Sequence, residues 1–295
     1  MEFSIITPSF RGSQWLKLCI ASVADQEGVQ HEHIVQDACS DDGTLDWLPH
    51  DSRVAAYVEK DGGMYDAVNR GLRRARGEIL AYINCDEQYL PGALRAVYDF
   101  FAQHPRIDVV FADMVVINPT GNYICHRKAM IPLASHLWLR FPAYTCSMFF
   151  RRRVLDQHEL YFDSRWRDIA DLFWVMKLVE QGITMSVMRR FTSAFTVTGD
   201  NMNLKPNAER EDRMKRDMTP SWIRKFGPAV VVHHHLRSLV QGLYFQKPFT
   251  YSIYTQAHAE RRASFEVTRP TFYWQHRRPD DVKKAAAQAT ANTSS

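Results

Sequence analysis

Short apolar runs alternate with segments of helical periodicity through the first part of the chain. Runs of this kind, bounded by turn residues, predict buried strands, and they lie at residues 3–8, 33–37, 54–58, 79–83 and 109–111. Apolar side chains recur at helical spacing in residues 15–23, 45–48, 64–75 and 94–101. Strands that alternate with helices favour a parallel sheet with right-handed crossovers. The pattern therefore predicts an α/β protein.

The second half of the chain departs from this regular alternation. A turn at residues 118–122 joins the stretches 114–117 and 123–127, which predicts antiparallel strands at the sheet edge. We expect a later strand at 146–150 and helices at 169–180, 209–218 and 221–244, followed by an irregular segment. The resulting division is an α/β domain at residues 1–204, a mainly helical, basic and aromatic extension at 205–280, and a disordered tail at 281–295.

Composition narrows the class of protein. With 295 residues and 45% hydrophobic content, the chain is long enough for one large domain or a domain with an appendage. A net charge of +4 is too small to indicate nucleic-acid binding. The five cysteines are widely and irregularly spaced, which fits neither a disulfide framework nor a zinc module. We also find no apolar run of ~20 residues and no charged-then-apolar leader, and therefore expect a cytoplasmic protein.

Polar residues follow two of the predicted strands. Asp37 opens an acidic turn at the carboxyl edge of the sheet, where it is placed to accept hydrogen bonds from a nucleobase. An Asx turn with solvated acids explains the same pattern. Asn84, Asp86 and Glu87 follow the strand at 79–83, and Mg²⁺ and Mn²⁺ favour such oxygen ligands beside substrate phosphates. The alternative is a polar loop without a metal.

Two helix starts carry further candidates. Asp66 opens the helix at 64–75 and Asn69 follows one turn later, so these side chains either contact a ligand or cap and pack the helix. Asp171 begins the helix at 169–180, where the helix dipole favours an ionised carboxylate. An ionised carboxylate beside a substrate can act as a general base. A helix-terminal acid without a catalytic role is the alternative.

In combination, these segments resemble the family 2 glycosyltransferases with the GT-A fold, particularly bacterial members that extend polysaccharide or lipid-linked oligosaccharide chains. The resemblance covers about residues 3–198. It rests on ordered blocks at residues 4–10, 37–44, 59–71, 77–79, 84–87, 149–152 and 170–171. It implies a Rossmann-like, mostly parallel central sheet with helices on both faces.

The resemblance also implies roles for individual residues. Nucleotide-sugar contacts would fall on Thr7, Pro8, Ser9, Asp37, Asp61, Asp66, Asn69, Asn84, Cys85 and Asp86. Asp86 would bind Mn²⁺ or Mg²⁺, with Glu87 as a second candidate ligand, and Asp171 would deprotonate the acceptor. The implied reaction is inverting transfer from a nucleoside diphosphate sugar to a hydroxyl of a saccharide or lipid-linked acceptor in cell-envelope polysaccharide synthesis.

Two positions depart from the family pattern. The D-x-D element begins with Asn84 in place of a carboxylate, and the loop at 142–146 lacks the His-Gln pair expected before the block at 149–152. A nucleotidyltransferase and a non-catalytic nucleotide-sugar-binding homologue therefore remain alternatives. The basic, aromatic extension either contacts the inner face of the cytoplasmic membrane or packs on the core.

Overall fold

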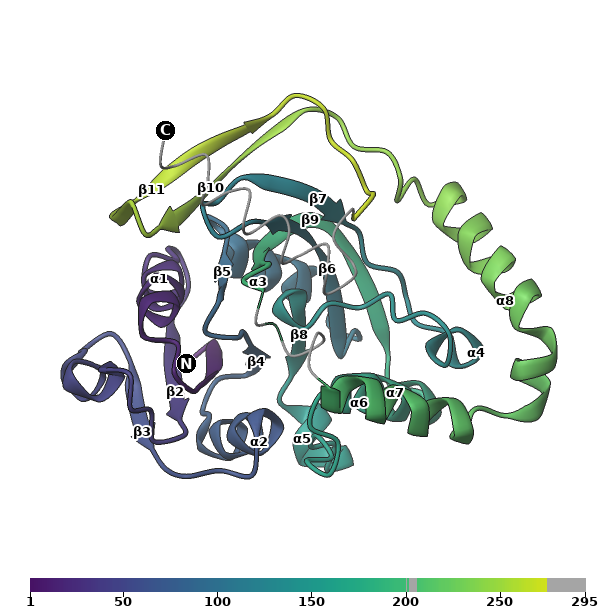
Figure 1. Ribbon diagram of the computed structural model, residues 1–295, viewed down its shortest axis with the longest axis horizontal. Coiled ribbons are helices and arrows are strands. Elements are labelled where there is room, and N and C mark those ends of the chain that lie inside the picture. Colours follow the sequence, from purple (N-terminus) through teal and green to yellow (C-terminus); the bar gives the residue numbers. More distant parts are fainter. Residues whose placement is uncertain (200, 202–205, 275–295) are drawn as a thin grey trace.

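A computed structural model describes residues 1–199, 201 and 206–274 of the protein. Within them, nine strands form one sheet, and two more form a hairpin (Figure 1). The order along the sheet is β3-β2-β1-β4-β8-β6-β9-β5, with β7 paired to β6. β1, β2, β3, β4, β6 and β9 run in one direction, and β5, β7 and β8 run against them. The predicted mostly parallel α/β sheet is therefore confirmed.

The elements alternate as the apolar pattern predicts up to β6. The strands are β1 (Phe3–Ser9), β2 (His31–Asp37), β3 (Ala55–Val58), β4 (Ile79–Tyr82), β5 (Glu87–Tyr89), β6 (Val109–Ile117), β7 (Tyr123–Arg127), β8 (Met148–Arg151), β9 (Met185–Thr196), β10 (Phe249–Thr255) and β11 (His258–Val267). The helices are α1 (Ser13–Ala24), α2 (Met64–Arg74), α3 (Ala93–Gln103), α4 (Ala134–Leu137), α5 (Arg153–His158), α6 (Ala170–Glu180), α7 (Pro206–Met218) and α8 (Ser221–Val240). Short 3₁₀ turns occupy Thr44–Asp46, Leu48–His50 and Thr145–Ser147.

Two apolar cores form, one on each face of the sheet. On one face, α2 and α6 pack their apolar sides over alternate residues of the central strands, for example Leu72 and Trp174 over Leu80 and Phe150. On the other face, α1 and α3 pack over the intervening strand residues. Both cores follow from strand geometry, because successive side chains point to opposite faces. The prediction of helices on both faces is confirmed.

The α2 helix lies unusually close to β1 because of a glycine. A Cβ built on Gly71 would lie 2.5 Å from the Cγ2 atom of Ile6, which is too near for any side chain. The residue before the helix, Gly63, has a φ of 130°, a conformation that side chains rarely adopt. The segment that opens α2 is therefore shaped for a close approach at the sheet edge.

The extension is helical at first and then returns to the sheet. α7 and α8 confirm the predicted helices, and α8 runs along the periphery of the molecule (Figure 1). The following segment, expected to be irregular, forms the β10-β11 hairpin. Arg262 of this hairpin binds the carboxylate of Asp25 at 2.6 and 2.7 Å, and Tyr254 donates to the same carboxylate. The hairpin is thereby attached to the end of α1.

Other features also differ from the sequence expectation. The short strand β5 and the long strand β9 were not predicted, although both complete the sheet. The predicted tail at residues 281–295 lies outside the described residues. In the part of the chain that the structure describes, no helix is both long enough and apolar enough to cross a lipid bilayer.

Candidate active site

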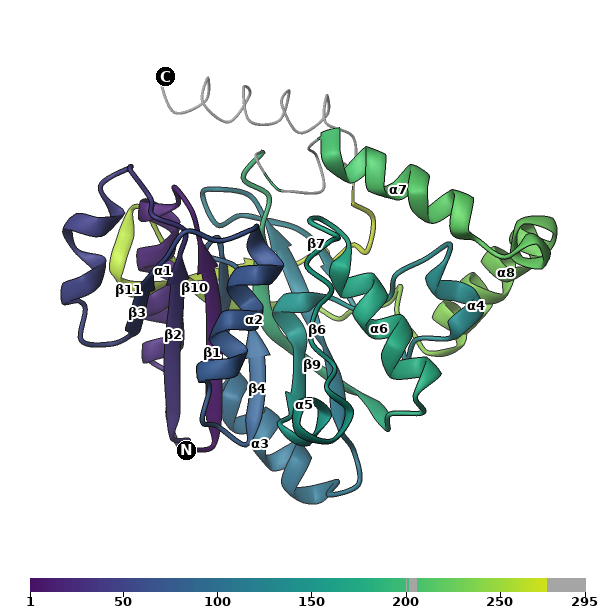
Figure 2. The ribbon, with the colours of Figure 1, turned by 90° about the horizontal axis from the view of Figure 1, so that it is seen from below.

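Parallel strands bring the predicted site residues to one edge of the sheet. β1 ends at Ser9, β2 at Asp37 and β4 at Tyr82, and the register pairs Ser9 with Asp37. The carboxyl ends of parallel strands share an edge, and open α/β sheets bind their ligands there. In Figure 2, β1, β2 and β4 lie side by side below this edge. The loops that follow these strands therefore form a common surface.

The end of β1 forms a buried floor at this edge. Thr7, Pro8 and Ser9 are all inaccessible to solvent or nearly so. The hydroxyl of Thr7 lies 2.8 Å from Nε2 of His33 on β2. The Ser9 hydroxyl is buried and has no hydrogen-bond partner among the described residues. These residues shape the base of the site through backbone and packing more than through exposed polar groups.

Asp37 forms the turn that the sequence offered as one of two interpretations, although its carboxylate is buried and not solvated. Its carboxylate accepts hydrogen bonds from the backbone N–H of Ser40 at 2.7 Å and from the Ser40 hydroxyl at 2.8 Å. This is the Asx-type turn considered as the alternative. The turn also fixes the carboxylate at the end of β2, because both oxygens are held. Binding of a nucleobase by Asp37 stays a prediction.

Asp61 lies in the loop between β3 and α2, Asp66 lies in the first turn of α2, and Asp61 is within electrostatic range of both Asp66 and Asp37. Burial raises the pKa of Asp61, and the negative charges of Asp66 and Asp37 act in the same direction. The N–H of Gly63 donates to Asp61 at 2.9 Å. In Asp66, burial is outweighed by the N–H of Gly62 and the guanidinium of Arg70, which lower its pKa. The three carboxylates thus form one acidic group at the sheet edge.

Asn69 faces the protein interior. Its amide nitrogen donates to the carbonyl of Phe162 at 2.7 Å, and its amide oxygen accepts from the N–H of Phe162 at 3.0 Å. The side chain is buried. The sequence left two roles open for Asn69, contact with a ligand or packing of the helix. Both the nitrogen and the oxygen of its amide are used in packing against Phe162.

The turn after β4 places several oxygen atoms together. The N–H of Asn84 donates to the Glu87 carboxylate at 2.8 Å. Burial and the adjacent charge of Asp86 raise the pKa of Glu87. The amide oxygen of Asn84 and the Oε1 atom of Glu87 are buried and lack a hydrogen-bond partner among the described residues. Cys85 packs against Gly12, where a Cβ would lie 2.8 Å from the Cys85 sulfur.

Asp86 is the accessible carboxylate of this turn. It is partly exposed, and Asn201 donates to its Oδ2 atom at 3.2 Å. Its neighbours supply oxygen atoms, the donor type that Mg²⁺ and Mn²⁺ prefer. In the described residues, no group of three or more His, Cys, Asp or Glu side chains gathers to hold a metal. Asp86, with the buried amide oxygen of Asn84 beside it, would be the residue to hold a divalent cation here, and the described residues do not form an all-protein metal cage.

Asp171 lies in the first turn of α6 and points to the same region. Removal from water raises its pKa to about 6, against the opposing effect of hydrogen bonds from the Leu172 N–H, 2.9 Å away, and the Tyr65 hydroxyl. The charge of Asp171 in turn raises the pKa of Glu87. Asp86 and Asp171 thus act on a shared neighbour although they are distant in sequence. The predicted metal ligand and the predicted base therefore both lie within electrostatic range of Glu87.

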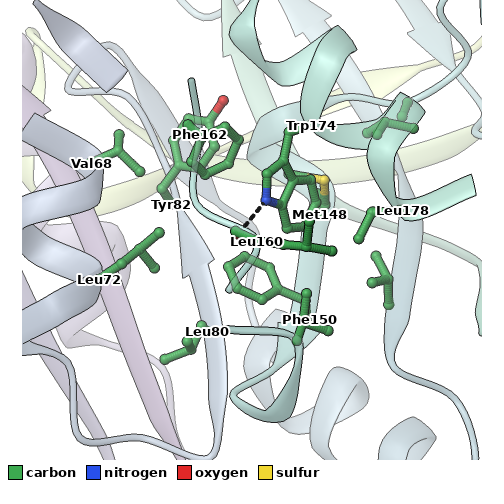
Figure 3. Close-up of a cluster of buried hydrophobic side chains, with 14 of the residues drawn as sticks. Val68, Leu72, Leu80, Tyr82, Met148, Phe150, Leu160, Phe162, Trp174 and Leu178 are labelled. Atoms are coloured by element: carbon green, nitrogen blue, oxygen red, sulfur yellow. Dashed lines mark hydrogen bonds between the residues drawn. The ribbon is translucent and has the colours of Figure 1, made fainter. Parts of the chain in front are cut away.

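An aromatic cluster anchors the helix that carries Asp171. Trp174, one turn further along α6, is buried and donates from its indole N–H to the carbonyl of Leu160 at 2.6 Å (Figure 3). Its ring contacts those of Phe150 and Phe162, each with centroids 5.1 Å away. Phe162 stacks in turn on Tyr65 of α2. The position of Asp171 is therefore tied to both the sheet and α2.

Three further residues contact the candidate site residues or the segment that leads to Asp171. Tyr65 lies against Asp171, Asn201 binds Asp86, and Glu211 of α7 binds the backbone just before α6. Tyr65 lies inside the block at 59–71, so its position was a usable signal. Asn201 and Glu211 act across long separations in sequence, and no local pattern distinguishes them.

The protein has an α/β fold, and the candidate carboxylates lie near the carboxyl edge of its sheet. The sequence model of glycosyl transferase family 2 matches residues 4–164, which is more than half of the chain. The chain belongs to glycosyl transferase family 2. The matched region contains Asp37, Asp61 and Asp86 and ends before Asp171.

Two curated relatives illustrate the similarity. A PGL/p-HBAD biosynthesis glycosyltransferase of Mycobacterium tuberculosis is 32% identical over 120 residues, which cover 39% of this chain and 47% of that protein. The poly(ribitol-phosphate) beta-N-acetylglucosaminyltransferase TarS of Staphylococcus aureus is 25% identical over 197 residues, which cover 64% of this chain and 34% of that protein. The matched segments thus span less than half the length of either relative.

Solved structures confirm the predicted GT-A-type fold. Residues 1–349 of S. aureus TarS in complex with UDP-GlcNAc match 70% of this chain and 61% of that chain, with a TM-score of 0.58 and 21% identity. The mannosyltransferase PcManGT of Pyrobaculum calidifontis in complex with GDP-Man and Mn²⁺ matches 73% and 60%, with a TM-score of 0.51 and 17% identity. At these identities the likeness concerns the fold alone.

Proposed function

We propose that this protein is a glycosyltransferase that moves a sugar from a nucleoside diphosphate sugar to a hydroxyl of a saccharide or lipid-linked acceptor in cell-surface polysaccharide synthesis. The observation that carries the proposal is that Asp86 and Asp171, which are distant in the sequence, both lie within electrostatic range of Glu87 near the carboxyl edge of the sheet. Family membership supports the reaction class. The relatives named for PGL/p-HBAD biosynthesis and for N-acetylglucosaminyl transfer to poly(ribitol-phosphate) support the setting, and the UDP-GlcNAc and GDP-Man complexes of the structural neighbours support the donor class.

The donor nucleotide binds beside the carboxylates of Asp37, Asp61 and Asp66. It lies on the floor formed by Thr7, Pro8 and Ser9. Asp37 is fixed by Ser40 and presents its remaining lone pairs to donors on the base. Asp61 lies partly buried beside it, where a ribose hydroxyl can donate. Asn69 supports this wall through Phe162 without touching the donor.

Asp86 would hold a divalent cation, and Asn84 and Cys85 line the same turn. A bound Mg²⁺ or Mn²⁺ supplies charge neutralisation for the diphosphate leaving group. Asn201 fixes one oxygen of the Asp86 carboxylate. Glu87 is engaged with the N–H of Asn84, and its burial disfavours the ionised form, so we give it a supporting role.

Asp171 acts as the general base in a single inverting displacement. Its carboxylate accepts the proton of the acceptor hydroxyl while that oxygen bonds to the anomeric carbon. The bond from the anomeric carbon to the diphosphate breaks on the opposite side, and its electron pair leaves with the nucleoside diphosphate. A base with a pKa near 6 is ionised at neutral pH and remains basic enough to assist.

A nucleoside diphosphate release assay over UDP-, GDP- and dTDP-sugars, with and without Mn²⁺, tests this proposal. With the active donor, we expect Asp86→Ala and Asp171→Asn each to lower kcat by about 100-fold or more, since removing such a group costs ~2.7 kcal/mol or more. Asp156→Asn, on the exposed part of α5, is the matched control. Wild-type rates in both site variants would overturn the mechanism.

Assays with the same protein also test the two alternative functions, a nucleotidyltransferase and a non-catalytic homologue. Pyrophosphate formed from a nucleoside triphosphate and a sugar phosphate would identify a nucleotidyltransferase. Nucleotide-sugar binding by calorimetry, with no diphosphate release under any metal or acceptor condition, would identify a non-catalytic homologue. Donor binding should survive Asp171→Asn, because this variant removes a base and leaves Asp86 intact.

We further propose that α8 rests on an anionic membrane surface that carries a lipid-linked acceptor. Its outward face exposes large apolar side chains, namely Trp222, Phe226, Val232, Leu236, Leu239 and Val240. The helix contains Arg224, Lys225 and Arg237 and no Asp or Glu. Apolar area beside positive charge is the composition of helices that lie in a bilayer interface. The opposite face, through Ile223 and Ser238, packs on the protein.

A further inference from the structure

The extension reaches back to the helix that carries Asp171. Glu211 lies on α7, outside the region at 4–164 that the family model matches. Its carboxylate accepts three consecutive backbone N–H groups, from Arg167 at 2.7 Å, Asp168 at 2.9 Å and Ile169 at 3.2 Å. Ile169 is the residue that precedes α6, and Asp171 follows two residues later. Figure 2 shows α7 beside α6.

A second residue of α7 fixes this contact. The amide nitrogen of Asn207 donates to Asp168 at 2.7 Å and to Glu211 at 3.0 Å. Glu211 is itself buried, which is unusual for a glutamate unless its charge is compensated. Bonds from N–H groups to a carboxylate are stronger than bonds between neutral partners. The contact is therefore buried and specific. We call it the clasp: the carboxylate of Glu211, the amide of Asn207 and the backbone of residues 167–169.

The clasp holds the segment that leads into α6, a helix without a side-chain cap of its own. No side chain of the residue preceding α6 caps the helix. The segment that leads into it would be free to shift if its N–H groups had no partner. A carboxylate supplied from α7 satisfies those groups and sets the angle at which the helix begins. Because Asp171 lies in the first turn, a change in that angle moves its carboxylate.

We propose that Glu211, supported by Asn207, is a positioning residue that holds Asp171 in the orientation required for proton abstraction. This inference rests on the proposed function, in which Asp171 is the base. It makes the extension part of the catalytic unit and not an appendage. Glu211 acts through the backbone of residues 167–169 and does not touch the substrate.

The test compares Glu211→Gln with Glu209→Gln, a matched control that removes an exposed carboxylate from the same helix. The amide keeps the size of Glu211 but cannot accept three N–H groups. We expect kcat to fall ~10- to 100-fold, since small displacements of a catalytic group have effects of this size. The KM for the donor sugar nucleotide should stay within about twofold, because the donor site is built from other elements.

Hydrogen exchange supplies a readout that does not depend on turnover. In Glu211→Gln, amides 167–169 should exchange faster than in the wild type, and the amides of β1 and β4 should not change. Asn207→Ala should produce a smaller change of the same kind. Rates are measured at a temperature where circular dichroism shows each variant folded, so that loss of fold is separated from loss of position.

The outcomes distinguish this inference from the proposed function. A kcat for Glu211→Gln equal to that of Glu209→Gln, or unchanged exchange at 167–169, would overturn the clasp. A donor KM that rises in step with the loss in kcat would also overturn it, since it indicates general disruption. If Asp171→Asn retains the wild-type rate of transfer, the proposed role of Asp171 as the base is wrong. This result does not depend on the behaviour of Glu211→Gln.

Discussion

Asn69 of α2 holds the backbone of Phe162 at both its N–H and its C=O, with distances of 3.0 and 2.7 Å. The two residues lie 93 positions apart and are both buried. Phe162 stacks against Tyr65 and Trp174, which flank Asp171 on two helices. The amide of Asn69 therefore joins α2 to the aromatic cluster that packs against the helix of the proposed base.

We expect Asn69→Ala to destabilise the protein by about 2–4 kcal/mol. The substitution removes two buried hydrogen bonds and leaves the N–H and C=O of Phe162 unpaired, at ~1–3 kcal/mol for each unsatisfied group. Urea unfolding followed by tryptophan fluorescence measures the change. Gln103→Ala, at an exposed position at the end of α3, is the control. A loss below 1 kcal/mol would show that the pair does not stabilise the fold.

The pH dependence of transfer follows from Asp171. Its pKa is raised to about 6 by burial, and the ionised form is the base. Activity should therefore rise with pH and reach half of its plateau near pH 6, whereas an unperturbed aspartate would give a midpoint near 4. Initial rates at saturating donor between pH 4.5 and 8 measure this rise of activity with pH. A flat profile across that range would contradict the assignment of Asp171 as the base.

Asp171→Asn should stabilise the protein at pH 8 while it abolishes transfer. A carboxyl group whose folded pKa exceeds its unfolded value contributes stability below the unfolded pKa, and this contribution is lost as pH rises through the folded pKa. A shift from 3.8 to about 6 corresponds to up to about 3 kcal/mol.

Urea unfolding at pH 4 and pH 8 measures the difference between wild type and Asp171→Asn. Between these values, wild-type stability should fall relative to that of the variant. If the wild type and Asp171→Asn have equal free energies of unfolding at both pH values, burial of the ionised Asp171 carboxylate does not destabilise the folded protein.

The α8 surface predicts binding to anionic vesicles. The double variant Leu236→Gln/Val240→Gln should bind vesicles of phosphatidylglycerol and phosphatidylcholine at least about tenfold more weakly, because each apolar side chain contributes ~1.5–3 kcal/mol when fully buried. Cosedimentation at 50 and 300 mM salt measures the effect, and binding should weaken at high salt.

Val58→Gln is the matched control for the vesicle experiment. Val58 is an exposed apolar residue on β3, at the far side of the molecule from α8 (Figure 1). Equal binding of the wild type, the control and the double variant would leave α8 without a membrane role. Binding to neutral vesicles that matches binding to anionic ones would remove the electrostatic part of the proposal.

Elements with a regular local pattern were predictable from the sequence. β1, β2, β3 and β4 are short apolar runs between turns, and α6 has a clear helical face. β9 was missed because Arg189 and Arg190 interrupt its apolar pattern. The structure shows why this is tolerated: Arg189 binds Asp113 at 2.9 Å, and the pairing with β6 shifts register at this point. β10 could have been predicted, because the large apolar residues Phe249, Tyr251 and Ile253 alternate with smaller polar residues, which is typical of a strand.

The sequence by itself determined the α/β class, the family resemblance and the candidate residues Asp37, Asp86 and Asp171, because these depend on residue types at fixed short spacings. The tertiary structure decided what surrounds them. It turned the amide of Asn69 inward, raised the pKa of Asp171 by burial, and placed Glu211 at the start of α6. Burial and contacts between distant segments exist only after folding, so no local pattern in the chain encodes them visibly.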